Sequence, residues 1–129
     1  MNVVDFPGWL EYFADGSNAT FFAPAIENTK QLIVPTVSIY EVFKRILQQR
    51  DEHTALLAIS SMYQGKAVDL DTAVAIQAAK LSCTHKLPLS DSMILATAVA
   101  HQAILWTQDA DFIKIEGVEY TERKKEWHN

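Results

Sequence analysis

Short apolar runs alternate along this chain with longer stretches whose apolar residues recur at helical spacing, and this alternation restricts the possible folds. The runs lie near residues 2–5, 32–34, 67–70, 103–107 and 118–120. Strands that alternate with helices need crossover connections, which favour a parallel sheet covered by helices on both faces. We therefore predict an α/β protein with three layers, α/β/α, around a central parallel sheet.

Capping and chain-breaking residues set the expected ends of the intervening helices. Ser17 is the expected N-cap of the second helix, Asp71 that of the fifth, and Pro35 is expected to end the second strand. The segment 87–90 breaks the chain before a strongly apolar helix. The predicted helices span residues 8–13, 17–26, 37–49, a segment around 56–62 that ends near Gly65, 71–85 and 91–102.

The length of 129 residues and an apolar content of 49% are typical of one domain with one substantial core, so we predict a single domain over residues 1–129. No stretch approaches the roughly 20 apolar residues of a membrane span, and the chain starts without a basic leader. These features favour a cytoplasmic protein without membrane association. Cys83, the single cysteine, cannot form an internal disulfide, and its apolar neighbours suggest a small buried residue rather than a nucleophile.

Acidic residues occur where the predicted strands end or helices begin. Asp5 follows the first run, Asp91 opens a helix, and Asp109 and Asp111 follow the run that ends at Thr107. Glu41 lies inside the helix after the second strand. In parallel sheets, ligands bind outside the carboxyl ends of the strands, where helices begin. This geometry would gather the five carboxylates into one cleft.

Each acid also has an ordinary structural explanation. Asp5 could cap the turn at Pro7, and Glu41 could pair with the cations one helical turn later. Ser90 or Asp91 could cap the apolar helix, and the two acids after the last long run could form a solvated turn. These explanations account for single positions. They do not explain why several acids end neighbouring elements.

A cluster of carboxylates favours a divalent cation, because unit charges about 4 Å apart repel by roughly 1–4 kcal/mol between bulk water and a protein surface. Ligation by oxygen alone suits Mg²⁺ or Mn²⁺, whereas zinc prefers histidine or cysteine. The histidines show no paired metal spacing: His53, His85, His101 and His128. We therefore predict a magnesium or manganese site built from the acids.

The net charge of −5 argues against a broad basic surface that neutralises many phosphates, so a nucleic acid would be contacted locally. Lys44 and Arg45, three and four residues after Glu41, could hold an RNA backbone beside it. The basic tail at residues 123–125 is expected to be a solvated, frayed end rather than an RNA contact.

Four local signatures follow one another along the chain. They are Val3-Val4-Asp5 with Trp9-Leu10-Glu11-Tyr12-Phe13, Ser38-Ile39-Tyr40-Glu41-Val42, the segment from Leu87 to Ala98 around Ser90-Asp91-Ser92, and Thr107-Gln108-Asp109-Ala110-Asp111-Phe112. In this order they resemble the PIN domain, and specifically the VapC-type toxin ribonuclease of VapBC toxin–antitoxin pairs. The resemblance covers nearly the whole chain.

The resemblance implies a metal-dependent endoribonuclease that hydrolyses RNA of the transfer or ribosomal class. Asp5, Glu41, Asp91 and Asp109 would then be catalytic, with Mg²⁺ or Mn²⁺ bound by the aspartates and by Asp111, which would add to the set or substitute in it. Thr107 would orient the site through its hydroxyl. Glu41 would be the first candidate to accept a proton from the attacking water. The resemblance further implies a homodimer and a cognate antitoxin that occupies the acidic cleft, commonly with a basic side chain.

One departure from the family pattern follows the first aspartate, where the family has small hydroxyl residues and this chain has Phe6-Pro7. Phe6 cannot support a neighbouring carboxylate or water, and Pro7 removes a backbone N–H. The alternative function is therefore a catalytically impaired module that docks an antitoxin or RNA without cutting it. A second alternative is an aspartyl-phosphate phosphatase or a receiver domain, but the first would need an aspartate at Pro7 and the second a lysine after a late strand.

Overall fold

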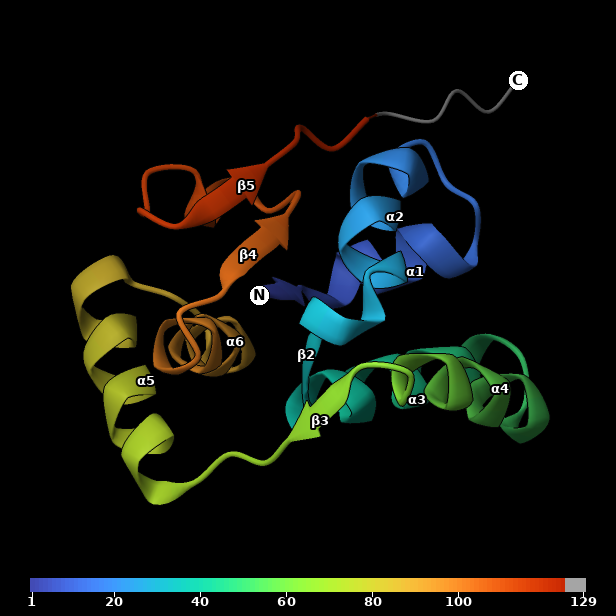
Figure 1. The fold of residues 1–129 in the computed structure, drawn as a ribbon, viewed down its shortest axis with the longest axis horizontal. Helices are drawn as coiled ribbons and strands as arrows, with labels where there is room; N and C mark the ends of the chain where they lie inside the picture. Colours follow the sequence, from blue (N-terminus) through green and yellow to red (C-terminus); the bar gives the residue numbers. More distant parts are fainter. Residues whose placement is uncertain (125–129) are drawn as a thin grey trace.

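The five strands form a parallel arrangement in the computed structural model of the protein, which describes residues 1–124 (Figure 1). The strands pair as β1-β4-β5 and β2-β3, all in parallel, and a parallel bridge between Asn2 and Leu32 joins the two groups. Their order is therefore β3-β2-β1-β4-β5, as expected for right-handed crossovers. The strands are β1 (Asn2–Val4), β2 (Ile33–Pro35), β3 (Lys66–Val68), β4 (Ile104–Thr107) and β5 (Val118–Tyr120).

Helices cover both faces of this sheet, which confirms the predicted α/β/α layers. In Figure 1, α5 and α6 lie together on one side, while α3 and α4 form a second pair, of which α3 also contacts α6. The helices are α1 (Phe6–Phe13), α2 (Ala19–Glu27), α3 (Thr36–Gln49), α4 (Glu52–Met62), α5 (Thr72–His85) and α6 (Leu89–Ala100), with 3-10 turns η1 (Thr29–Gln31) and η2 (Ala110–Phe112).

Consecutive strand residues supply two separate cores, because successive side chains in a strand point to opposite faces. Val4 and Val34 pack with Trp9 and residues of α2, α3 and α4 in one core. Their neighbours Val3 and Ile33 pack with residues of α6 in the other. All five side chains are at most 1% exposed, so the short apolar runs of the sequence are buried on both sides.

Several predicted element ends are wrong by a few residues. The N-cap of α2 is Asn18 and not Ser17, and α1 begins at Phe6 rather than at residue 8. Pro35 does end β2, as predicted, but it is itself the last residue of the strand and also the N-cap of α3. Its φ of −62° and ψ of 139° satisfy the extended strand and the start of a helix together.

Asp71 does cap α5, where its side chain accepts a hydrogen bond from the backbone N of Val74. Cys83 is exposed on α5, so the expectation of a buried cysteine is wrong. Its apolar sequence neighbours do not bury it, because α5 packs against α6 with the face that carries Val74, Ala78 and Leu81, and Cys83 lies outside that face. None of the helices within residues 1–124 is both long enough and apolar enough to span a membrane.

Candidate active site

Asp5 lies buried at the carboxyl end of β1 and is 2% exposed. Its Oδ1 accepts a hydrogen bond of 2.9 Å from the backbone N of Gly8, so Asp5 is the N-cap of α1, and the predicted cap is confirmed. Its Oδ2 accepts a hydrogen bond from the Thr107 hydroxyl. Burial raises the pKa of Asp5 from its ordinary 3.8 to about 7, although both hydrogen bonds act in the opposite direction.

The Thr107 hydroxyl connects Asp5 to the second aspartate segment. The pairing of β1 with β4 aligns Val4 with Trp106, and Asp5 continues it by donating its backbone N–H to the Trp106 carbonyl. Thr107 thereby lies beside Asp5, and its Oγ1 also accepts a hydrogen bond of 2.9 Å from the backbone N of Asp109. A single buried hydroxyl therefore fixes the relative position of the two strand ends.

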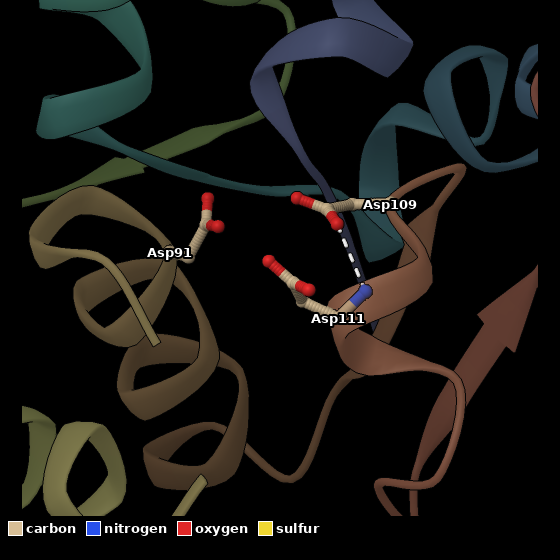
Figure 2. Close-up of side chains that lie close together, drawn as sticks. All are labelled: Asp91, Asp109 and Asp111. Carbon is tan, nitrogen blue, oxygen red and sulfur yellow. Dashed lines mark hydrogen bonds between the residues drawn. The ribbon is translucent and has the colours of Figure 1, made fainter. Parts of the chain in front are cut away.

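Asp109 and Asp111 lie on the 3-10 turn η2 that follows β4. Asp109 is the N-cap of this turn, and its Oδ1 accepts a hydrogen bond of 2.9 Å from the backbone N of Asp111 (Figure 2). Phe112, buried in the core, anchors the turn. The two acids do form a turn, but they do not simply face the solvent, because Asp109 is half-buried.

Asp91 lies in the first turn of α6 and caps nothing. The N-cap is Pro88, without a side-chain hydrogen bond, so the expectation that Ser90 or Asp91 caps this helix is wrong. Pro88 is extended and supplies the first helix carbonyl, which accepts from the backbone N of Ser92 at 3.0 Å. The cap position therefore falls two residues earlier than expected, and the carboxylate of Asp91 is available for another role.

Three carboxylates converge in what we term the carboxylate cluster, Asp91, Asp109 and Asp111. One oxygen from each lies within 4.8 Å of the others, and Figure 2 shows the side chains from α6 and η2 turned toward one another. Burial and then the charge of Asp109 raise the pKa of Asp91 to about 7. This arrangement of like charges offers oxygen ligands only, which is the donor set that Mg²⁺ and Mn²⁺ prefer.

Asp5 and Glu41 lie beside this cluster rather than in the group of three. The charges of Asp91 and Asp109 contribute to the raised pKa of Asp5, and the charge of Glu41 contributes to that of Asp91. Sequence reasoning therefore placed all five acids in one region. The three with oxygens within 4.8 Å of one another are a subset that includes Asp111 and leaves out Asp5.

Glu41 is half-buried on α3, and its Oε1 is buried with no hydrogen-bond partner among the residues that the structure describes. Burial raises its pKa, while the nearby Ser90 hydroxyl opposes the shift. A buried carboxylate oxygen without a partner is costly unless a proton or a cation compensates it. The cations expected to pair with Glu41 lie over rings instead: Lys44 Nζ is 5.6 Å from the Tyr40 ring centre, and the Arg45 guanidinium is 5.2 Å from that of Phe6.

Asn18 is a polar residue of the site region that sequence reasoning missed. It is 2% exposed, and its Nδ2 donates to Gln108 Oε1 at 2.9 Å and to the Glu122 carbonyl at 3.1 Å. Gln108 lies between Thr107 and Asp109, so Asn18 holds both the end of β4 and the C-terminal segment. Partners 90 and 104 residues away leave no local signal in the sequence.

The C-terminal segment is held where it passes the site, just before the predicted solvated end at residues 123–125. The backbone N of Thr121 donates to the Thr107 carbonyl at 3.0 Å, and Asn18 binds the next residue. Arg123 and Lys124 follow directly, whereas Lys125 and His128 lie outside the described residues.

Phe6 and Pro7 do not disrupt the cap at Asp5. They occupy the first two positions of α1, where a backbone N–H has no partner within the helix. The N–H that Asp5 uses belongs to Gly8. The proline therefore removes a donor that this arrangement does not need.

Solved structures with this fold include several toxin–antitoxin proteins. A chain of a toxin–antitoxin complex from Klebsiella pneumoniae is 25% identical, with a TM-score of 0.77 over 92% of this chain and 96% of that one. VapC20 of Mycobacterium tuberculosis, a sarcin-ricin loop cleaving toxin, is 13% identical, with a TM-score of 0.74 over 92% and 97%. A chain of VapBC2 from Rickettsia felis, bound to a promoter DNA fragment, is 9% identical, with a TM-score of 0.74 over 94% and 97%.

The sequence itself gives a family match. No curated protein sequence matches the chain at a significant level. The family model of the PIN domain, however, matches residues 3–118, which include all five acids of the site region and nearly the whole sheet. The chain therefore belongs to the PIN domain family.

Proposed function

We propose that this protein is a Mg²⁺- or Mn²⁺-dependent endoribonuclease, the toxin of a toxin–antitoxin pair, which cleaves transfer or ribosomal RNA in the cytoplasm. The observation that carries the proposal is the carboxylate cluster at the carboxyl edge of a parallel sheet, where such folds bind their ligands. Similar structures support it, because one belongs to a toxin–antitoxin complex and another is a toxin that cleaves the sarcin-ricin loop.

The donor set and the buried oxygen of Glu41 fit a divalent cation. Asp91, Asp109 and Asp111 would hold the ion, with Asp5 as a further ligand. Bound Mg²⁺ or Mn²⁺ supplies Lewis-acid chemistry, which lowers the pKa of water and stabilises charge on the phosphate under attack. A cation would also relieve the repulsion that raises the pKa of Asp91.

The remaining residues of the site position groups or move a proton. Glu41 Oε1 accepts a proton from the attacking water, a role suited to a half-buried carboxylate with a raised pKa and a free oxygen. Thr107 keeps Asp5 and Asp109 in register through its hydroxyl. Lys44 and Arg45, exposed on α3 one turn after Glu41, contact the RNA backbone.

The proposal includes two protein partners. A cognate antitoxin covers the acidic cleft with a basic side chain, and two copies of the toxin form a homodimer. Similar chains occur in toxin–antitoxin complexes from Klebsiella pneumoniae and Rickettsia felis, which supports an antitoxin partner.

A second candidate is a module that docks RNA or an antitoxin without cutting it. It is favoured by Phe6, which stands next to Asp5 where a small hydroxyl side chain would otherwise support the site. Changing Phe6 and Pro7 together to serine separates the candidates. A large gain in cleavage would favour an impaired enzyme, and no gain in a silent parent would favour the module.

The test of the enzyme is cleavage of a pool of transfer and ribosomal RNA by antitoxin-free protein with Mg²⁺, Mn²⁺ or chelator. Asp91→Asn removes a cluster charge, and Asp69→Asn makes the same change at an exposed acid outside the site. We expect discrete, metal-dependent fragments from the wild type and Asp69→Asn, and none from Asp91→Asn. Folded wild type that cuts no RNA would leave the docking module as the better proposal.

A further inference from the structure

An open groove of about 1020 Å³ lies between α1, α3, the start of α4 and the C-terminal segment, and Gln108, the neighbour of Asp109, is among its lining residues. Within residues 1–124, its walls carry four cations, which define what we term the basic groove: Arg45, Arg50, Arg123 and Lys124. Glu11, the one acid that lines the groove in this part of the chain, already accepts a hydrogen bond of 3.1 Å from the backbone N of Asn18. In a chain with a net charge of −5, this is a local concentration of positive charge.

The basic groove continues toward the reacting centre. A smaller hollow of about 460 Å³ shares Gln108 and Arg123 with it and is also lined by Asp109 and Tyr120. Asn18 fixes this junction, because it binds the Gln108 side chain and the carbonyl before Arg123. A linear polyanion lying in the groove would therefore reach the carboxylate cluster at Asp109.

Aromatic groups accompany the cations along this path. Phe6 lines the groove, and the Arg45 guanidinium lies 5.2 Å from its ring centre. Unpaired bases stack on aromatic rings and on guanidinium planes, and cations contact the phosphates between them. An acidic peptide would account for the cations, but not for their combination with rings on a path to metal-ligand acids.

We propose that the basic groove binds a single-stranded segment of RNA and leads it to the carboxylate cluster. Phe6 stacks a base, while Arg45, Arg50, Arg123 and Lys124 contact the backbone. The residue that departs from the family pattern thus has a positive role in substrate recognition. The proposal rests on the ribonuclease function for what happens at Asp109, but not for the binding itself.

The cations are tested by fluorescence anisotropy with a labelled single-stranded RNA of mixed sequence and the full-length protein. Chelator is present so that metal-dependent cleavage does not interfere, and affinity is measured over a range of salt. Removing a cation that neutralises one phosphate should reduce the slope of log affinity against log salt by about 0.7. We expect this reduction for Lys124→Ala and none for Lys80→Ala, the same change at an exposed lysine on α5.

Phe6 is tested with an RNA that carries 2-aminopurine, whose fluorescence is quenched on stacking. Phe6→Leu keeps an apolar side chain but removes the ring, so affinity should fall on the order of tenfold and the quenching should disappear. Phe6→Tyr should restore both. Thermal melts confirm that each variant is folded, and reduced affinity with the quenching unchanged would assign Phe6 a packing role only.

Three results of the binding experiments would overturn the basic groove as an RNA site: the folded wild type binds no RNA, Lys80→Ala and Lys124→Ala change the salt slope equally, or polyglutamate competes as well as unlabelled RNA at equal charge. The last would identify an acidic peptide as the occupant. Groove-dependent binding without any metal-dependent cleavage would refute the ribonuclease alone, and cleavage indifferent to groove variants would refute the groove alone.

Discussion

Asp5 and Asp91 both have a pKa near 7, but they lie in contrasting surroundings. Asp5 is fully buried and accepts hydrogen bonds from the Gly8 N–H and the Thr107 hydroxyl. Asp91 is half-buried, has no cap to form, and faces the charges of other acids. Burial is the largest cause in both, but the charge of Asp109 is the second cause for Asp91 and the smallest for Asp5.

The contrast divides the site into two parts. Asp5, held by its hydrogen bonds to Gly8 and Thr107, forms what we term the structural wall, and the carboxylate cluster forms the wall that needs an ion. The hydrogen bonds of Asp5 fix its position whether or not a cation is present. Asp91, Asp109 and Asp111 repel one another until a cation or protons neutralise them. One part of the site is thus preorganised by the fold, and the other is completed by its ligand.

The largest expected effect comes from the wall that needs an ion. Asp91→Asn should reduce metal-dependent cleavage by more than about a hundredfold, since changing even the groups that support metal ligands costs about 10–100-fold. The melting temperature in chelator should not fall, because a charge has left a repulsive cluster. Initial rates and thermal melts check this, with Asp69→Asn as the control; a clear drop in melting temperature would contradict the contrast.

Thr107→Val changes the structural wall, and unlike Asp91→Asn it should lower the stability of the protein. This change removes the partner of Asp5 Oδ2 and of the Asp109 N–H, so the free energy of unfolding should fall by about 1–3 kcal/mol. Cleavage should fall about 10–100-fold because two ligands are no longer held in register. Denaturant unfolding is compared with Thr97→Val, a buried threonine that donates only to the Met93 carbonyl within α6; equal destabilisation would refute a special role for Thr107.

Asn18→Ala should have a smaller effect on cleavage than Thr107→Val, because Asn18 binds Gln108 and Glu122 rather than Asp5 or Asp109. It removes two hydrogen bonds, each worth about 0.5–1.5 kcal/mol net, and releases Gln108 and Glu122. Asn28→Ala, at the other end of α2, changes an exposed asparagine that makes no side-chain cap bond. Urea unfolding of the two variants should differ, and equal stability would show that the tether to the C-terminal segment is unimportant.

The finest test follows the two carboxyl groups separately by carboxyl ¹³C NMR. Asp109→Asn should lower the pKa of Asp91 clearly and that of Asp5 much less. Both folded pKa values exceed the unfolded value of about 3.9, so the folded protein holds more protons between about pH 4 and pH 7. The unfolding free energy of the metal-free protein should therefore fall as pH rises through this window, and less steeply in Asp109→Asn. Equal pKa shifts at Asp5 and Asp91 would contradict the distinction between the structural wall and the carboxylate cluster.

The sequence was informative where local patterns decide the structure. Runs such as Val3-Val4 mark strands because both faces of the sheet are covered, and acids after these runs predict the site at the strand ends. The sequence was uninformative where a contact with a residue far along the chain decides the structure. Nothing around Asn18 indicates Gln108 or Glu122, and nothing around Cys83 shows which face of α5 packs against α6. Asp91 lies in the first turn of α6, but its freedom from capping depends on the backbone of Pro88, which the sequence pattern did not reveal.

The pairing of β1 with β4 also determines when the site can exist. Asn2 of β1 pairs with Ile104 of β4, so the two paired strands are separated by about a hundred residues of sequence. Contacts this distant in sequence form late, because a long loop must close before they contribute. A chain emerging during synthesis can complete α3 and α4 while Asp109 and Asp111 are still missing. The carboxylate cluster is therefore one of the last features to assemble, and a partially synthesised chain holds its acids apart.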